Sequence, residues 1–232
     1  MASKPFLIVF DCDGTLADSQ NIIAEAMRFA FRSIGFAVPD QAAVMRIVGL
    51  SLDEAVFALA PQADEALRAE AVRAYRERYL ALRLRGNVEP LFPGAASLLR
   101  KLAEREDTVL GIATGKSKRG LIAMLEQNGI NGLFSTMQTA DDAPSKPHPA
   151  MLMQAMNETG AAAHSTVMIG DTSHDTIMAT AANVASIGVT WGYHSAAELR
   201  RAGATRIANS FAELERLLDA RPIRAPLCEV VA

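Results

Sequence analysis

The sequence predicts an α/β protein with a three-layer, Rossmann-like core around a parallel sheet and an inserted all-helical cap domain. Four apolar runs are each followed by a polar or glycine-containing turn and then a helical pattern, an order typical of parallel strands. From about residue 19 to residue 85 the periodicity is helical throughout, which predicts the insertion. We therefore expect a discontinuous α/β core, residues 1–17 and 87–232, and a helical cap, residues 18–86.

Composition narrows the class of protein. The 232 residues are 50% hydrophobic and 21% charged, which excludes a disordered or collagen-like chain. The formal net charge of −3 argues against a dedicated nucleic-acid-binding protein, because such proteins usually carry a basic excess. Cys12 and Cys228 cannot build a disulfide framework, and the early apolar run is too short to span a membrane. We expect a cytoplasmic protein with no membrane partner.

The strands of the core are expected where the apolar runs lie. Residues 6–10 read Phe-Leu-Ile-Val-Phe and end at Asp11, as expected for a strand buried on both faces of a sheet. The other strands are expected at residues 109–113, 166–169 and 184–189.

The cap should contain at least two long helices. The first is expected to begin after Ser19, whose side chain can cap it, and to stop near Gly35. The second is predicted by apolar residues at spacings of three and four, namely Leu67, Ala71, Tyr75, Tyr79 and Leu82. Turn-rich stretches at residues 86–87 and 90–94 are suited to hinges, and the residues after Asp219 are expected to be an irregular tail.

Two aspartates follow the first predicted strand, at the end where open α/β sheets bind ligands. Asp11 and Asp13 are two positions apart and are followed by Gly14, so one carboxylate can face a substrate while the other is displaced along the loop. One can attack phosphorus and the other can donate a proton to the departing oxygen. The same residues could instead form an ordinary turn at a strand end.

Two further segments offer groups that could bind phosphate. Thr114 and Gly115 follow the strand at residues 109–113, where a hydroxyl and backbone N–H groups could receive phosphate oxygens or simply cap a helix. Lys146 lies among three prolines that stiffen the chain before a helix. A rigid cation suits a phosphate, although a lysine by itself is usually a solvated surface charge.

A second pair of carboxylates, Asp171 and Asp175, follows the strand at residues 166–169. Oxygen-rich sites without thiolates suit magnesium, which prefers one or two protein carboxylates together with water and substrate phosphate. Aspartates at the start of a helix can also merely complement the helix dipole.

Together these segments fall at the carboxyl ends of predicted strands, so they converge on one edge of the sheet. In set and order they resemble the four motifs of the haloacid dehalogenase superfamily. The helical insertion after the first motif looks like the cap of the phosphoglycolate phosphatase-like members. The resemblance implies a magnesium-dependent phosphatase that hydrolyses a small phosphorylated metabolite, phosphoglycolate among the candidates, through an aspartyl phosphate.

The resemblance also implies a role for each motif residue. Asp11 would be the nucleophile, and Asp13 would be the general acid and then the base for water. The phosphate oxygens would be held by Thr114, Gly115 and Lys146, with Lys146 also counted among the catalytic residues. Magnesium would be bound by Asp11, the backbone carbonyl of Asp13, Asp171 and Asp175, the last of these directly, through water, or by orienting Lys146.

Two features depart from the family pattern or bear on specificity. Gly115 stands where relatives of this type often have Asn, and Lys116 can partly compensate for the missing side chain. Residues 46–51 are the best candidate for a loop over the active site, and Arg46 could bind an anionic group of the substrate there. Arg46 could equally be a solvated helix residue.

Other functions remain open from the sequence. A sugar phosphomutase of the same superfamily would use the same two aspartates but return the phosphoryl group to another position of the sugar. A signalling module that accepts phosphate on an aspartate is a different class, although such modules lack a helical insertion and carry the acceptor after a middle strand. The sequence leaves the oligomeric state undetermined.

Overall fold

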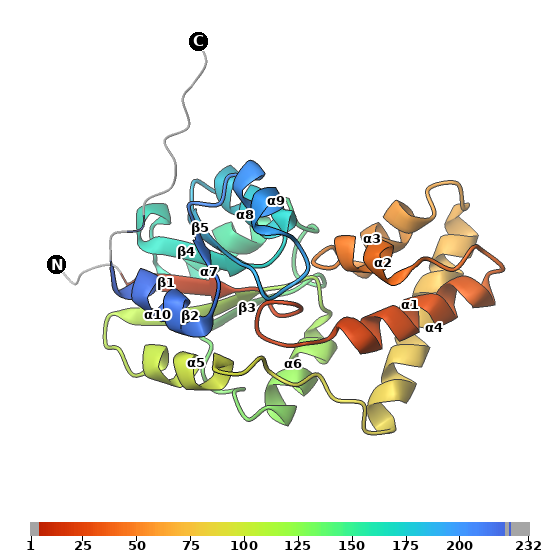
Figure 1. The fold of residues 1–232 in the computed structure, drawn as a ribbon, viewed down its shortest axis with the longest axis horizontal. Coiled ribbons are helices and arrows are strands. Elements are labelled where there is room, and N and C mark those ends of the chain that lie inside the picture. Colours follow the sequence, from red (N-terminus) through yellow and green to blue (C-terminus); the bar gives the residue numbers. More distant parts are fainter. Residues whose placement is uncertain (1–4, 221–222, 224–232) are drawn as a thin grey trace, which may run out of the picture.

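A six-stranded parallel sheet lies at the centre of the core (Figure 1). In spatial order its strands are β3 (Thr136–Gln138), β2 (Thr108–Ala113), β1 (Phe6–Phe10), β4 (Thr166–Gly170), β5 (Ala185–Val189) and β6 (Arg206–Ala208). The four predicted strands are confirmed. β3 and β6 lie at the two edges of the sheet, and at three residues each they are too short to show a pattern in the sequence.

The computed structural model describes residues 5–220 and 223. The expectations for the tail after Asp219 and for Cys228 therefore fall almost wholly outside the described residues.

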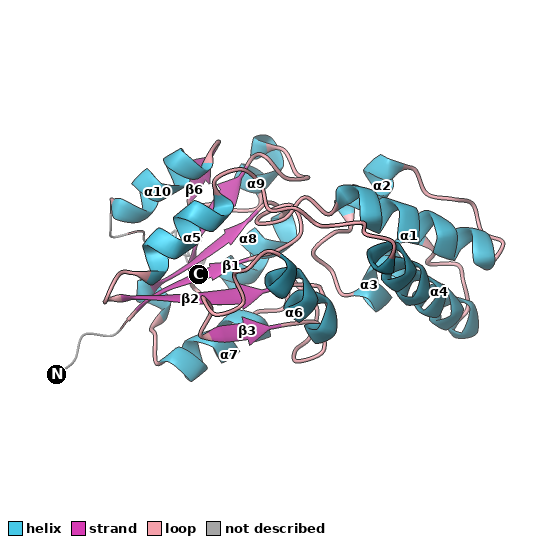
Figure 2. Ribbon diagram, turned by 90° about the horizontal axis from the view of Figure 1, so that it is seen from below, coloured by secondary structure: helices cyan, strands magenta, loops and turns pink. Residues whose placement is uncertain are grey.

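Helices cover both faces of the sheet, which makes the three layers (Figure 2). On β1, Phe6, Ile8 and Phe10 share one apolar cluster with the helices α5 (Ala95–Ala103), α6 (Lys118–Gln127) and α10 (Phe211–Asp219). Leu7 and Val9 point to the other face and share a cluster with α7 (Ala150–Thr159) and α8 (Ser173–Ala181). A short 3-10 turn, Ala163–Ser165, precedes β4, and α9 (Ala196–Arg201) packs near β5 and β6. Because β1 is buried on both faces, its unbroken apolar run is explained.

Between β1 and α5 the chain forms the cap, which lies beside the sheet and not upon it (Figure 1). Its helices are α1 (Gln20–Ser33), α2 (Gln41–Arg46), α3 (Leu52–Leu59) and α4 (Glu65–Leu84). They enclose an apolar cluster of their own, in which α1 and α4 pack along each other. The predicted α/β class with a helical insertion is confirmed, whereas the division at residues 17/18 and 86/87 stays a prediction.

One local prediction in the cap is wrong in its detail. Helix α1 does begin after Ser19, but the Ser19 hydroxyl makes no capping hydrogen bond. It donates instead to the carboxylate of Asp13, so a tertiary partner has replaced the local one. The helix ends at Ser33, and Gly35 follows with a φ of 69°. In the described part of the chain we find no helix with both the length and the apolar composition needed to cross a membrane.

Candidate active site

The carboxyl ends of three neighbouring strands bring the predicted motifs together. Asp11 directly follows β1, Thr114 follows β2 and Asp171 follows β4, and these strands are adjacent in the order β2, β1, β4. Lys146 reaches the same place from the segment between β3 and α7. All four residues are buried, as expected for a site at the strand ends of an open sheet.

Lys146 is held between two carboxylates. Its Nζ lies 2.8 Å from Oδ1 of Asp11 and 2.6 Å from Oδ1 of Asp175, and all three side chains are buried. Burial lowers the pKa of Lys146, but the two carboxylates more than offset this, so the pKa is raised above its ordinary value. Lys146 is therefore a fixed positive charge inside the protein.

Three carboxylates share this region. One oxygen from each of Asp11, Asp171 and Asp175 lies within 4.8 Å of the others. Asp171 accepts hydrogen bonds from the hydroxyl of Thr15 at 2.8 Å and from the backbone N–H of Tyr193 at 2.9 Å. Oδ2 of Asp11 is buried and has no hydrogen-bond partner among the described residues. A buried acceptor without a partner, beside two more carboxylates, fits a hard divalent cation such as Mg²⁺.

The pKa shifts of these carboxylates also indicate a site for a cation. Burial raises the pKa of Asp11 to about 7; Lys146 opposes this shift and the carboxylate of Asp175 adds to it. The pKa of Asp171 is raised well above its usual range, first by burial and then by the charges of Asp11 and Asp175. One lysine does not neutralise three buried carboxylates, so a bound cation would lower the cost of their ionisation.

Two glycines make room for Asp171. Gly14 has a φ of 86°, and a Cβ there would lie 2.7 Å from Cγ of Asp171. A Cβ at Gly192 would also collide with the Asp171 side chain. The backbone on both sides of this carboxylate can come so close only because these positions lack side chains.

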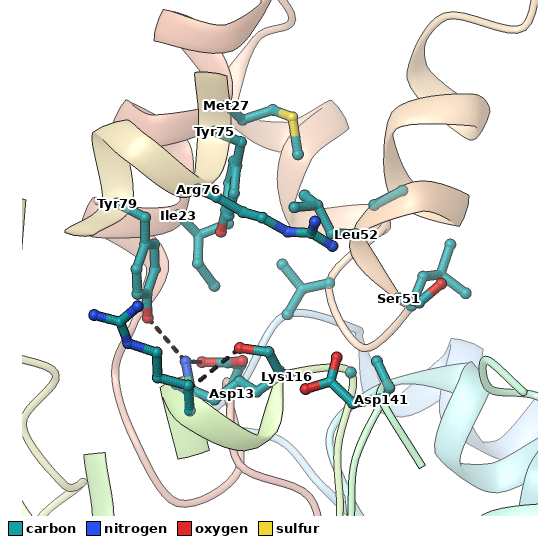
Figure 3. A pocket seen from close by; sticks show the side chains of 18 of the residues that line it. Asp13, Ile23, Met27, Ser51, Leu52, Tyr75, Arg76, Tyr79, Lys116 and Asp141 are labelled. Carbon is teal, nitrogen blue, oxygen red and sulfur yellow. Dashed lines mark hydrogen bonds and ion pairs between the residues drawn. The ribbon is translucent and has the colours of Figure 1, made fainter. Parts of the chain in front are cut away.

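Asp13 takes part in a different group of polar side chains. Its Oδ1 accepts a hydrogen bond from the Ser19 hydroxyl and lies 2.8 Å from Nζ of Lys116. The same Nζ lies 3.1 Å from Oε2 of Glu89. It also donates a hydrogen bond to the hydroxyl of Tyr79 at 3.0 Å (Figure 3). This group connects the first motif, the segment before α6, the segment that leaves the cap and the cap helix α4.

Sequence reasoning missed Glu89 and most of the role of Lys116. Glu89 lies between the two predicted hinge stretches and is 1% exposed. Burial raises its pKa, while the charge of Lys116 opposes the shift. Burial also lowers the pKa of Lys116, but Asp13 and Glu89 outweigh it, so that pKa is raised. Nothing in the local pattern could have paired Glu89 with Lys116, because they come from separate elements.

The loop after α2 contacts the core segments that carry Gly115 and Lys146. The backbone N–H of Ser51 donates to Oγ of Ser145 at 2.8 Å. A Cβ at Gly115 would lie 2.7 Å from the carbonyl oxygen of Gly49 and closer still to that of Leu50. The contact between loop and core thus explains why Gly stands at position 115: a larger residue would displace the loop.

Arg46 lies apart from the other predicted site residues. It is the last residue of α2, it is exposed, and it is not among the residues that line the cavity described below. Its contact with the core is made by its backbone carbonyl, which accepts a hydrogen bond from Nε2 of His174 at 3.4 Å. The assignment of Arg46 to substrate binding stays a prediction.

A cavity of about 1030 Å³ lies between the cap and the core (Figure 3). Asp13, Gly115 and Ser145 line the end of it that adjoins the active site. Each of these is close in sequence to a buried motif residue, since Asp13 follows Asp11 by two positions and Ser145 directly precedes Lys146. The cavity therefore adjoins the place where a phosphate would meet Asp11.

Comparison with known proteins agrees with the fold and the motifs. Residues 8–189 match the family model described as haloacid dehalogenase-like hydrolase. A protein named probable phosphatase IndB, from Dickeya dadantii (strain 3937), is 38% identical over 215 residues, which cover 91% of this chain and 92% of the relative. A phosphoglycolate phosphatase from Vibrio cholerae is 30% identical over 196 residues, covering 81% of this chain and 85% of the relative. The crystal structure of a predicted phosphatase from Clostridium acetobutylicum has a TM-score of 0.84 at 28% identity, over 94% of this chain and 100% of that one. The chain belongs to the haloacid dehalogenase-like hydrolase family.

Proposed function

We propose that the protein is a magnesium-dependent phosphatase that hydrolyses a small phosphate monoester through an aspartyl phosphate on Asp11. The proposal rests on the contacts of the two oxygens of the Asp11 carboxylate. One oxygen accepts a hydrogen bond from Lys146 at 2.8 Å, and the other is buried without a hydrogen-bond partner among the described residues. An Asp11 oxygen also lies within 4.8 Å of oxygens from Asp171 and Asp175.

Each residue of the site would have its own role in the reaction. Lys146 cancels part of the repulsion between the Asp11 carboxylate and a dianionic phosphate. At the end of β2, Thr114 and the backbone N–H of Gly115 would receive phosphate oxygens. Magnesium would be held by Asp11, the backbone carbonyl of Asp13 and Asp171, with Asp175 nearby, and when bound it would neutralise charge on the transferring phosphoryl group.

The chemical steps follow from these positions. Asp11 forms a bond to phosphorus while the bond to the leaving oxygen breaks, and the carboxyl group of Asp13 delivers its proton to that oxygen. Asp13 then takes a proton from a water molecule that attacks the phosphoryl group, which releases inorganic phosphate and restores both aspartates. Lys116 and Ser19 both contact Oδ1 of Asp13, so the proton would be carried by Oδ2.

The relatives support the reaction class and suggest one substrate. Two of them carry the name phosphatase, and the one from Vibrio cholerae is named for phosphoglycolate, which makes that ester a candidate here. A phospho-accepting signalling module would not need the helical insertion that this chain has. Transfer back to a sugar remains distinguishable from hydrolysis, because only hydrolysis releases inorganic phosphate with each turnover.

The test is release of inorganic phosphate from a panel of monoesters with and without Mg²⁺. To detect the intermediate, the enzyme is mixed with an ester labelled in its phosphoryl group and the reaction is quenched with acid. An acyl phosphate on Asp11 would survive the acid and would be cleaved by hydroxylamine. We expect label on the wild-type chain and none on Asp11→Asn. Turnover by a folded Asp11→Asn chain would reject the aspartyl phosphate.

A further inference from the structure

We propose that the leaving group of the substrate is bulky, uncharged and largely apolar, and that it occupies the cavity between the cap and the core. This inference rests on the proposed phosphatase function and names the class of ester that the site selects. Three properties of the cavity support it: its size, its balance of charge and its apolar wall.

The size of the cavity exceeds what a very small ester needs. Its volume is about 1030 Å³, at the upper end of the range of roughly 300–1000 Å³ that is typical for pockets enclosing drug-sized ligands. The two-carbon leaving group of phosphoglycolate would leave most of this space to water. A leaving group with a ring or a long hydrocarbon part would fill it.

The charges that line the cavity are balanced. Four basic and four acidic side chains line it, and among the basic ones only Lys116 is buried. Lys116 already faces Asp13 at 2.8 Å and Glu89 at 3.1 Å, so its charge is matched within the protein. A carboxylate on the leaving group would lose its hydration here. It would find no buried cation that lacks an acidic partner of its own, so the cost of desolvation would not be recovered. The buried part of the cavity is thus suited to an uncharged group.

Most of the cap residues that line the cavity are apolar or aromatic, although Asp53, Arg76, Glu77 and Arg83 also line it. The apolar and aromatic ones include Ile23, Met27, Leu52, Tyr75 and Tyr79 (Figure 3). The rings of Tyr75 and Tyr79 are stacked, with centroids 5.7 Å apart, and the hydroxyl of Tyr79 is fixed by Lys116. Such a wall offers flat surfaces to a planar or hydrocarbon group.

The mouth of the cavity exposes large aliphatic side chains. Leu80 is 40% exposed, Leu84 is 80% exposed and Val88 is 56% exposed, and all three line the cavity. Exposed apolar side chains that adjoin one another often mark a binding surface. Because this surface is continuous with the end lined by Asp13, the occupant we assign to it is the leaving group of the ester bound at Asp11.

The experiment compares two esters that have similar intrinsic reactivity. Ethyl phosphate and 2-phenylethyl phosphate both release a primary alcohol, so a difference in kcat/KM reports recognition of the ring. With Mg²⁺ present we expect kcat/KM to be at least about tenfold higher for 2-phenylethyl phosphate, the ratio that burial of a ring of this size would give. Phosphoglycolate, assayed beside them, is expected to be a poorer substrate than 2-phenylethyl phosphate.

Two variants test whether the ring of the ester is bound in the cavity. Leu80→Asp places a charge at the mouth on an already exposed position of α4, and it should lower the ratio between the two alkyl esters at least about threefold. Phe57→Ala is the matched control, because Phe57 is an exposed apolar residue of the cap that does not line the cavity. It should leave the ratio unchanged.

The outcomes separate this inference from the proposed function. If ethyl phosphate or phosphoglycolate is hydrolysed with Mg²⁺ at least as well as 2-phenylethyl phosphate, the inference is overturned and the phosphatase function stands. An unchanged ratio in Leu80→Asp would likewise overturn the location. If none of the esters, nor any other monoester of the panel, is hydrolysed, the proposed function fails and the inference fails with it.

Discussion

Lys116 and Asp13 form a buried ion pair, with Nζ 2.8 Å from Oδ1, between the segment that precedes α6 and the loop that follows β1. Glu89, on the segment that leaves the cap, lies 3.1 Å from the same Nζ. The proposed general acid is therefore held by a lysine that also contacts the cap and the chain leaving it. This arrangement links the position of Asp13 to the position of the cap.

Loss of the Lys116 charge should destabilise the fold. In Lys116→Met, Asp13 and Glu89 would remain buried without a cation, and breaking a buried ion pair in this way typically costs about 3–5 kcal/mol. For a chain of this size that corresponds to a fall in Tm of about 6–20 °C, measured by circular dichroism at pH 8.

The double variant Lys116→Met with Glu89→Gln is the control for this interpretation. Removing one of the two uncompensated charges should recover part of the lost Tm. If the double variant were no more stable than Lys116→Met, the loss would come from packing and not from buried charge.

Asp11→Asn should abolish turnover in a folded protein. The amide preserves the size of the side chain but cannot form the acyl phosphate, so we expect kcat to fall by at least about 10³-fold, the scale on which loss of a catalytic group is usually felt. Phosphate release and far-ultraviolet circular dichroism measure activity and fold together. Substantial activity in the folded variant would remove Asp11 from the role of nucleophile.

Asp171 should contribute to metal affinity. Titration of the metal-free protein with MgCl₂ should raise Tm, because a ligand that binds only the folded state stabilises it. Asp171→Asn keeps the shape of the side chain but loses its charge, and we expect it to need at least about tenfold more Mg²⁺ for the same rise. The thermal readout does not depend on substrate. Equal titration curves would exclude Asp171 as a ligand, and full activity in EDTA would exclude the metal.

The stability of the metal-free protein should depend on the ionisation of Asp11. Its pKa is raised from 3.8 to about 7, chiefly by burial, so between these values the folded protein binds more protons than the unfolded chain. The free energy of unfolding contributed by this group therefore falls as the pH rises from about 4 to about 7. In EDTA, we compare the Tm of Asp11→Asn with the Tm of the wild type at pH 5 and at pH 8. The Tm of the variant minus that of the wild type should be larger at pH 8 than at pH 5 by about 3 °C or more. A gain that did not change with pH would contradict the raised pKa.

Arg46→Ala tests the one predicted binding residue that lies apart from the others. Because the Arg46 side chain is exposed and does not line the cavity, we expect KM for phosphoglycolate and for 2-phenylethyl phosphate to stay within about twofold of wild type. A rise of about tenfold in KM for phosphoglycolate alone, equivalent to ~1.4 kcal/mol, would instead support the assignment made from the sequence.

The sequence alone determined the class of fold and the edge of the sheet at which the motif residues meet. The apolar run before Asp11 and the repeated order of strand, turn and helix are local patterns. Because parallel strands bring their carboxyl ends to one edge of a sheet, the positions of Asp11, Thr114 and Asp171 after three such strands were enough to predict that they lie together. The helical periodicity that predicted α1 and α4 is local in the same sense.

Only the tertiary structure decided the partners of the polar side chains and the character of the cavity. Ser19 was expected to cap a helix by a local rule, but it bonds to Asp13 because the folded chain supplies a stronger acceptor. Glu89 and Lys116 show no mutual pattern in the sequence, and their pairing depends on how the chain returns from the cap to the core. The size and charge balance of the cavity are set by side chains from separate helices and loops. Such properties arise from the packing of distant segments, which periodicity and motif spacing do not encode.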